Sequence, residues 1–134
     1  MREILFRGKR KENGRWIYGS LVPKETNSYA DGFLIIDGAL NYDELDYYQP
    51  SFSTYSVVPE TIGQYIGLND KNGKKIFEGD IVKCLSLEYV YVNKEVYYSE
   101  DKGKFVLHSC GTDYEFDEYI NVEVVGDIYD DKGF

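Results

Sequence analysis

Residues that could do chemistry are few, and the clearest set contains the only histidine. Cys110 follows His108 by two residues, and Cys84 could approach from another strand. A zinc site built from them would need a carboxylate as fourth ligand, and no Cys-x-x-Cys pair supports it. A Cys–His nucleophile pair must be in hydrogen-bond reach, but i and i+2 positions on a strand stand about 6.5–7 Å apart. We therefore expect no metal, no cofactor and no catalytic residue, and the protein is predicted not to be an enzyme.

The two cysteines also bear on the cellular compartment. Residues 1–7 have no long apolar run and no small-residue cleavage site, so we expect no signal peptide. No run approaches the roughly 20 apolar residues of a membrane span. The sequence therefore predicts a cytoplasmic protein without membrane contact, in which Cys84 and Cys110 are free thiols unless neighbouring strands bring them together.

The most patterned stretch is GLNDKNGKKIFEGDIV, residues 67–82. As a calcium loop starting at Asp70, it would have Lys75 where glycine is needed and Ile81 where a bidentate Glu is needed. As a phosphate loop it fails because Gly-Lys-Lys runs into a strand, not a helix. Asn72-Gly73 instead predicts a hairpin tip, since this pair suits the two positive-φ positions of a type I′ turn.

Charge is distributed unevenly along the chain. Residues 1–24 hold seven Lys/Arg against two Glu, a net charge of +5. The remaining residues carry a net charge of −14, which gives the total of −9. A basic segment of this kind can contact a nucleic acid or an acidic partner, or lie beside the chain's own acidic strands. Aromatic residues among the cations could add base stacking. The candidate contact residues for a nucleic acid or partner are Arg7, Lys9, Arg10, Lys11, Arg15 and Trp16.

Strand signals dominate the 134 residues, 14 of which are Tyr. A helix is expected only at 41–48, where Asn41 could cap a turn or two. Asn93-Lys94 could turn between two of the strands, although it lacks glycine. The expected strands, separated by Gly, Asn, Asp and Lys, cover 4–7, 16–22, 32–36, 55–58, 61–66, 81–85, 89–92, 96–98, 104–109, 113–116 and 122–129.

An internal echo suggests two halves. KENGRWIYGSLV at 11–22 resembles DKNGKKIFEGDIV at 70–82, and ETIGQY at 60–65 resembles EVVGDI at 123–128. We expect a hairpin tip at each Asn-Gly and a bulge or bend at Gly19 and Gly79. The sequence thus predicts an all-β fold with little helix, built as two small barrel-like, SH3-like halves at 1–66 and 67–134. The echo is compatible with duplication or with chance similarity.

Three blocks of the sequence resemble the YopX family of phage and prophage proteins. They are MREILFRGK with KENGRWIYG, TIGQYIGLNDKNGKKIFEGDIVK, and VEVVGDIYDD, and they occur in the family's order along the whole chain. The chain departs at Ile66, where the family often has Thr, and in the tyrosine-rich stretch 86–98. The resemblance implies a small, mostly β protein encoded by phages or prophages of Gram-positive hosts, with oligomers possible. It implies no activity, so no catalytic residue is carried over.

These observations leave three hypotheses. The first is a non-enzymatic protein-interaction module with a host or phage partner, because aromatic residues are common at interfaces. The second is nucleic-acid binding through the basic N-terminal strand, whose affinity would fall steeply with salt. The third is an acidic body that imitates DNA and occupies a DNA-binding protein, which would require carboxylates spaced like phosphates.

Overall fold

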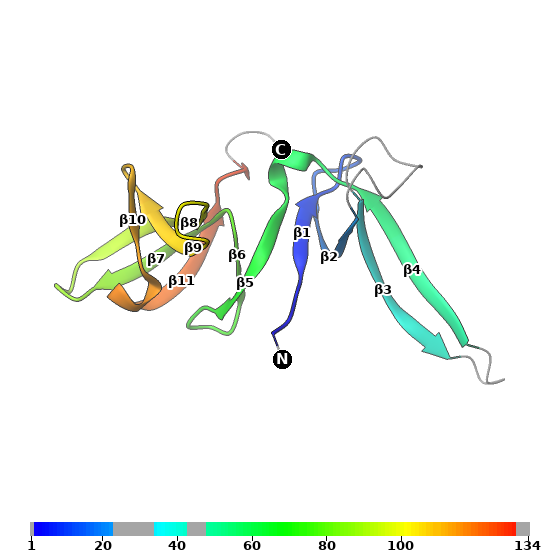
Figure 1. Cartoon of the computed structure of the whole chain (residues 1–134), viewed down its shortest axis with the longest axis horizontal. Helices are drawn as coiled ribbons and strands as arrows, with labels where there is room; N and C mark the ends of the chain where they lie inside the picture. The colour runs from blue at the N-terminus through cyan, green and yellow to red at the C-terminus, as the bar shows by residue number, and fades with distance from the viewer. Residues whose placement is uncertain (1, 23–33, 43–47, 131–134) are drawn as a thin grey trace. The chain divides into compact units, whose positions relative to one another are not determined.

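The computed structural model describes residues 2–22, 34–42 and 48–130. The chain divides into two compact units, one of Ile4–Gly63 and one of Met1–Glu3 with Gln64–Phe134. Figure 1 labels their strands and colours them by residue number. The boundary predicted between residues 66 and 67 falls inside a strand, Gly63–Asn69. The division into two halves that pack closely stays a prediction.

The unit Ile4–Gly63 contains an antiparallel meander in the order β4-β3-β2-β1. Its core contains Ile35 and Val57, both fully buried, and Gly8 packs so closely on Val57 that an added Cβ would lie 3.0 Å away. Buried Thr61 accepts a hydrogen bond from the Lys9 N–H and donates one to a carbonyl. The elements are β1 (Phe6–Lys9), β2 (Trp16–Val22), β3 (Leu34–Tyr42), β4 (Tyr48–Ser56) and the 3-10 helix η2 (Pro59–Thr61).

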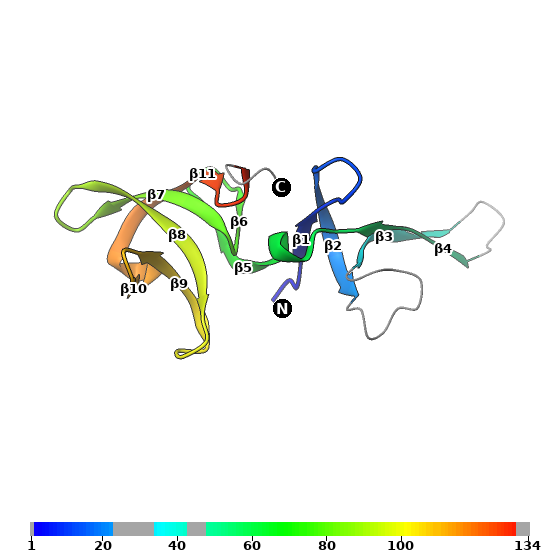
Figure 2. The same ribbon diagram turned by 90° about the horizontal axis from the view of Figure 1, so that it is seen from above.

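The second unit combines the β5–β6 hairpin with an antiparallel sheet in the order β10-β9-β8-β7-β11. Figure 2 shows the pronounced curvature of β8. The elements are β5 (Gly63–Asn69), β6 (Lys75–Phe77), β7 (Asp80–Ser86), β8 (Tyr91–Ser99), β9 (Lys104–Ser109), β10 (Thr112–Tyr114), the 3-10 helix η3 (Phe116–Glu118) and β11 (Tyr119–Asp127).

Alternating strand residues build the core of this second unit. Because successive side chains point to opposite faces, Val82 and Cys84 of β7 are buried while Lys83 between them is exposed. They pack with Ile76, Val96 and Leu107 from three other strands. Partly buried side chains cover this cluster: Ile66, Val92, Tyr114, Phe116, Tyr119, Val122 and Val124.

Both Asn-Gly pairs lie at turns, as the sequence predicts. Gly14 and Gly73 have φ angles of 70° and 83°. The type I′ assignment is wrong for both tips, because neither Asn13 nor Asn72 is among the positive-φ residues. At the second tip the Gly73 N–H bonds the Asp70 carbonyl across an ordinary β-turn. The bend at Gly79 is confirmed by its φ of 92° in the β6–β7 turn. Gly19 forms no bulge, because it pairs regularly with Phe6.

The all-β class is confirmed, but the prediction of barrel-like halves is wrong. In the described part of each unit the sheet remains open. The second unit lacks a ladder between its edge strands β10 and β11, which are connected by η3. Strand β10 has only three residues, too few for a long ladder. The edges approach instead through Tyr114 and Tyr119, whose ring centroids lie 6.0 Å apart.

Two local predictions also fail. The expected helix at 41–48 is contradicted at both ends, where Tyr42 of β3 pairs with Tyr48 of β4; residues 43–47 lie outside the described part. The turn expected at Asn93-Lys94 lies inside β8, where these residues pair with β7. The connection between β7 and β8 is instead residues 87–90.

Candidate functional site

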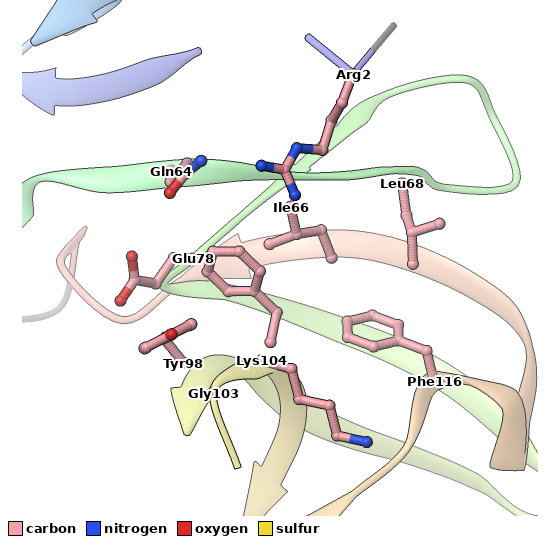
Figure 3. Close-up of a pocket in the computed structure, with 10 residues that line it drawn as sticks. Arg2, Gln64, Ile66, Leu68, Glu78, Tyr98, Gly103, Lys104 and Phe116 are labelled. Carbon is pink, nitrogen blue, oxygen red and sulfur yellow. The ribbon is translucent and has the colours of Figure 1, made fainter. Parts of the chain in front are cut away.

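The second unit contains an amphipathic pocket with a volume of about 570 Å³ (Figure 3). Strand β5 supplies one wall, to which Gln64, Ile66 and Leu68 contribute. Phe105 from β9 and Phe116 from η3 contribute aromatic surface. The lining residues are Arg2, Gln64, Ile66, Leu68, Glu78, Tyr98, Gly103, Lys104, Phe105 and Phe116.

Charged groups stand at the pocket's rim. Lys104 Nζ lies 2.6 Å from the Glu115 carboxylate, which neutralises it. The segment before β1 is held by an ion pair of 3.6 Å between Glu3 and Lys75. This arrangement places Arg2 over the pocket, and Figure 3 shows its side chain pointing inward. The pocket therefore offers apolar walls with one positively charged group directed into it.

The tip of the β7–β8 hairpin is a second distinctive surface. Leu87 is 72% exposed and Tyr89 is 84% exposed, and they are followed by the exposed Val90 and Tyr91. The turn is ordered by backbone bonds, because the Ser86 N–H bonds the Val90 carbonyl at 2.9 Å and Tyr89 donates to Ser86. Tyr89 has a φ of 62°, a conformation that costs a non-glycine residue about 1–3 kcal/mol. We call residues 87–91 the apolar tip.

The basic residues predicted as contacts lie in different environments. Arg7 and Lys9 are only 4% exposed, and their charged groups lie 4.1 and 5.3 Å from the centre of the Trp16 ring. Arg10 lies 4.3 Å above the Tyr55 ring and 3.0 Å from the Glu12 carboxylate. Of the six predicted contact residues, Lys11 and Arg15 are exposed. The structure thus brings together Arg7, Lys9 and Trp16, but largely removes that cluster from the surface.

His108, Cys84 and Cys110 lie in three different environments. His108 Nδ1 lies 2.8 Å from an Asp113 oxygen on the neighbouring strand, and its ring packs on Tyr97. Cys110 is exposed in the turn after β9, with a φ of 52°, whereas Cys84 is buried in the core; both are free thiols. In residues 2–22, 34–42 and 48–130, no three His, Cys, Asp or Glu side chains gather as metal ligands.

Asp70, the first residue of the rejected calcium pattern, is buried and accepts three backbone hydrogen bonds. Its Oδ1 accepts from the N–H groups of Asn72 and Lys74 at 2.8 and 2.9 Å, and its Oδ2 accepts from Val124 at 3.0 Å. Burial raises its pKa, but the bonds from Val124, Lys74 and Asn72 outweigh burial, so the pKa is lowered. Asp70 therefore fixes the β5–β6 hairpin to β11.

Sequence reasoning missed both surfaces. The apolar tip was obscured because Tyr89 was placed in a strand. Arg2 carried no signal that would distinguish it from the other basic residues of the N-terminal segment.

No helix in the described part of the chain has the length and apolarity needed to cross a bilayer.

The antiparallel strands of the two units define an all-β protein. The chain belongs to the YopX protein family, whose model matches residues 5–133. A solved structure, protein EF1440 from Enterococcus faecalis, is similar with 22% sequence identity and a TM-score of 0.64. The similarity covers 99% of this chain and 98% of that one and concerns the fold. A comparison with curated proteins finds no match.

Proposed function

We propose that the protein is a phage- or prophage-encoded, non-enzymatic module that binds another protein in the host cytoplasm through the apolar tip. The observation that carries this proposal is the exposure of Leu87 and Tyr89, at 72% and 84%, on an ordered turn. Aromatic residues are enriched at interaction hot spots, and exposed apolar patches commonly mark contact surfaces.

Preorganisation supports the same role. Binding costs free energy when loops and side chains must become ordered. Here the Ser86 hydroxyl accepts a hydrogen bond of 3.2 Å from the Val90 N–H, in addition to the backbone bonds of the turn. Tyr89 is held in a conformation that Tyr rarely adopts. A turn that is already ordered loses less entropy when a partner covers it.

Affinity capture from the bacterium that carries the gene, with and without prophage induction, tests the proposal. The test variant combines Leu87→Ser with Tyr89→Asn, since Asn tolerates positive φ. Ile120→Ser is the matched control, because Ile120 is 50% exposed on β11. A captured protein is then purified and titrated.

We expect wild type and the Ile120→Ser control to bind that protein at least about tenfold more tightly than the tip variant. Self-association lost in the tip variant would instead assign the tip to a second copy. Recovery of no partner, retained binding by the tip variant, or substrate turnover by the purified protein would each contradict the proposal.

Nucleic-acid binding is a second candidate function, favoured by one observation in the first unit. Arg10 and Tyr55 stack beside Lys11 in a pocket of about 450 Å³. Cations next to an aromatic face are a common arrangement for single-stranded nucleic acids. The burial of Arg7 and Lys9 weakens this candidate relative to the first. The third hypothesis, an acidic DNA mimic, stays a prediction.

A further inference from the structure

Arg2 is an unusual member of the amphipathic pocket, because no described residue forms an ion pair with it. Lys104, the pocket's other cation, is instead paired with Glu115 at 2.6 Å. Figure 3 shows the Arg2 guanidinium directed toward Ile66. A guanidinium group is weakly hydrated and binds a carboxylate with two parallel hydrogen bonds.

The remaining walls select for an apolar ligand body. Ile66, Leu68, Phe105 and Phe116 surround the space in front of Arg2, and Leu68 is 47% exposed although it is a large apolar side chain. Covering such surface is favourable by about 25 cal/mol per Å². A volume of about 570 Å³ lies within the usual range for small-molecule pockets.

We propose that this pocket binds an apolar molecule or chain end that carries a single carboxylate, with Arg2 pairing to that carboxylate. A dianionic phosphate fits less well, because Arg2 is the single cation of the lining left without an ion pair in the described residues. The proposal is independent of the apolar tip.

Two sources supply this chemistry: a free medium-chain carboxylic acid, and the carboxyl terminus of a peptide that ends in an apolar residue. The first experimental arm therefore titrates octanoate against octanamide. The second titrates acetyl-Ala-Ala-Leu as the free acid against its amide. Binding is followed by NMR shifts of the backbone amides of Ile66 and Leu68, where we expect saturation with a dissociation constant on the order of 1 mM for a ligand of this size.

Three variants make the test specific. Arg2→Gln removes the charge and should weaken binding of the acid about tenfold, as the loss of a charge-assisted pair does. Leu68→Gln removes part of the apolar wall at an exposed position and should weaken both acid and amide. Arg15→Gln makes the same charge change in the other unit and should leave binding unchanged. Each variant's amide spectrum first establishes that the unit is folded.

The proposal is supported if either acid saturates the pocket amides, its neutral counterpart binds at least about fivefold more weakly, and Arg2→Gln removes that preference. The arm with the tighter acid then identifies the source. Equal binding of acid and amide, an Arg2→Gln variant that binds like wild type, or the absence of saturable shifts in both arms would overturn it.

Discussion

Replacing Asp70 by Asn tests whether this carboxylate secures the β5–β6 hairpin. The change preserves size and removes the charge. In the folded chain the carboxylate accepts hydrogen bonds from Asn72, Lys74 and Val124, at 2.8–3.0 Å. An amide side chain has one oxygen, so it can continue to serve the two turn N–H groups. Its NH₂ group would then face the Val124 N–H, donor against donor.

The expected loss of stability follows from that geometry. One partly buried N–H loses its acceptor, and the bonds that remain lose the assistance of a charge. A hydrogen bond to a charged group contributes about 1.5–3 kcal/mol, and an orphaned donor costs about 1–3 kcal/mol. We therefore expect Asp70→Asn to lower the free energy of unfolding by about 2 kcal/mol at pH 7, or roughly 10 °C in melting temperature for a unit of this size.

The pH dependence distinguishes this mechanism from a general packing defect. Because the folded pKa of Asp70 lies below the unfolded value of about 3.9, its contribution is complete above the unfolded pKa. It is lost as the pH falls through the folded pKa. Asn cannot titrate, so the gap between wild type and Asp70→Asn should be constant above about pH 5 and shrink below about pH 4.

Urea unfolding of both proteins across this pH range measures the gap. Asp101→Asn is the matched control, because it removes the same charge at an exposed turn. It should change the free energy of unfolding by no more than about 0.5 kcal/mol. A gap that does not change with pH, or an Asp70→Asn variant as stable as wild type at pH 7, would refute the role of the carboxylate.

Three further predictions concern turns, thiols and the basic segment. Gly73→Val should destabilise the protein by about 1–2 kcal/mol, because Gly73 has a φ of 83°. Gly79→Ala should destabilise it more, because the added Cβ would also lie 2.7 Å from a ring carbon of Tyr129. Thermal unfolding ranks the two variants, and a Gly73→Val variant with the melting temperature of wild type would contradict the turn. A thiol reagent should modify the exposed Cys110 rapidly and the buried Cys84 only upon unfolding, since burial also raises the pKa of Cys84. Rapid modification of both cysteines in the folded protein would contradict this prediction. If the chain binds nucleic acid, Lys11→Glu should weaken binding and flatten its salt dependence in fluorescence titrations, and salt-independent binding would exclude the electrostatic mechanism.

Alternation and turn residues predicted much of the fold because they act locally. The strands 16–22 and 104–109 have the predicted bounds, and both Asn-Gly tips are turns. The β7–β8 connection was misplaced since its tip contains no glycine and uses Tyr89 at positive φ instead. A rare conformation of this kind depends on the hydrogen bonds around it, which residue type alone does not indicate.

The basic segment shows why predicted contact residues need the strand register. Lys9 lies directly opposite Trp16 in the β1–β2 pair, and Arg7 lies two residues along the same strand. Cross-strand neighbours of this kind interact, so both cations stack on the indole. Counting charges in residues 1–24 could not show which cations would be withdrawn from solvent in this way.

The stretch 67–82 invites a binding function because of its glycines and acids, yet its polar groups are engaged within the fold. Asp70 accepts three N–H groups, the Asp80 carboxylate accepts the N–H of Phe77, and Gly79 leaves room for Tyr129. The stretch therefore serves as scaffold: it positions the β5 wall of the pocket and starts β7, which ends at the apolar tip. The stretch also supplies Leu68 and Glu78 to the lining of the pocket, although no motif within it indicates a ligand.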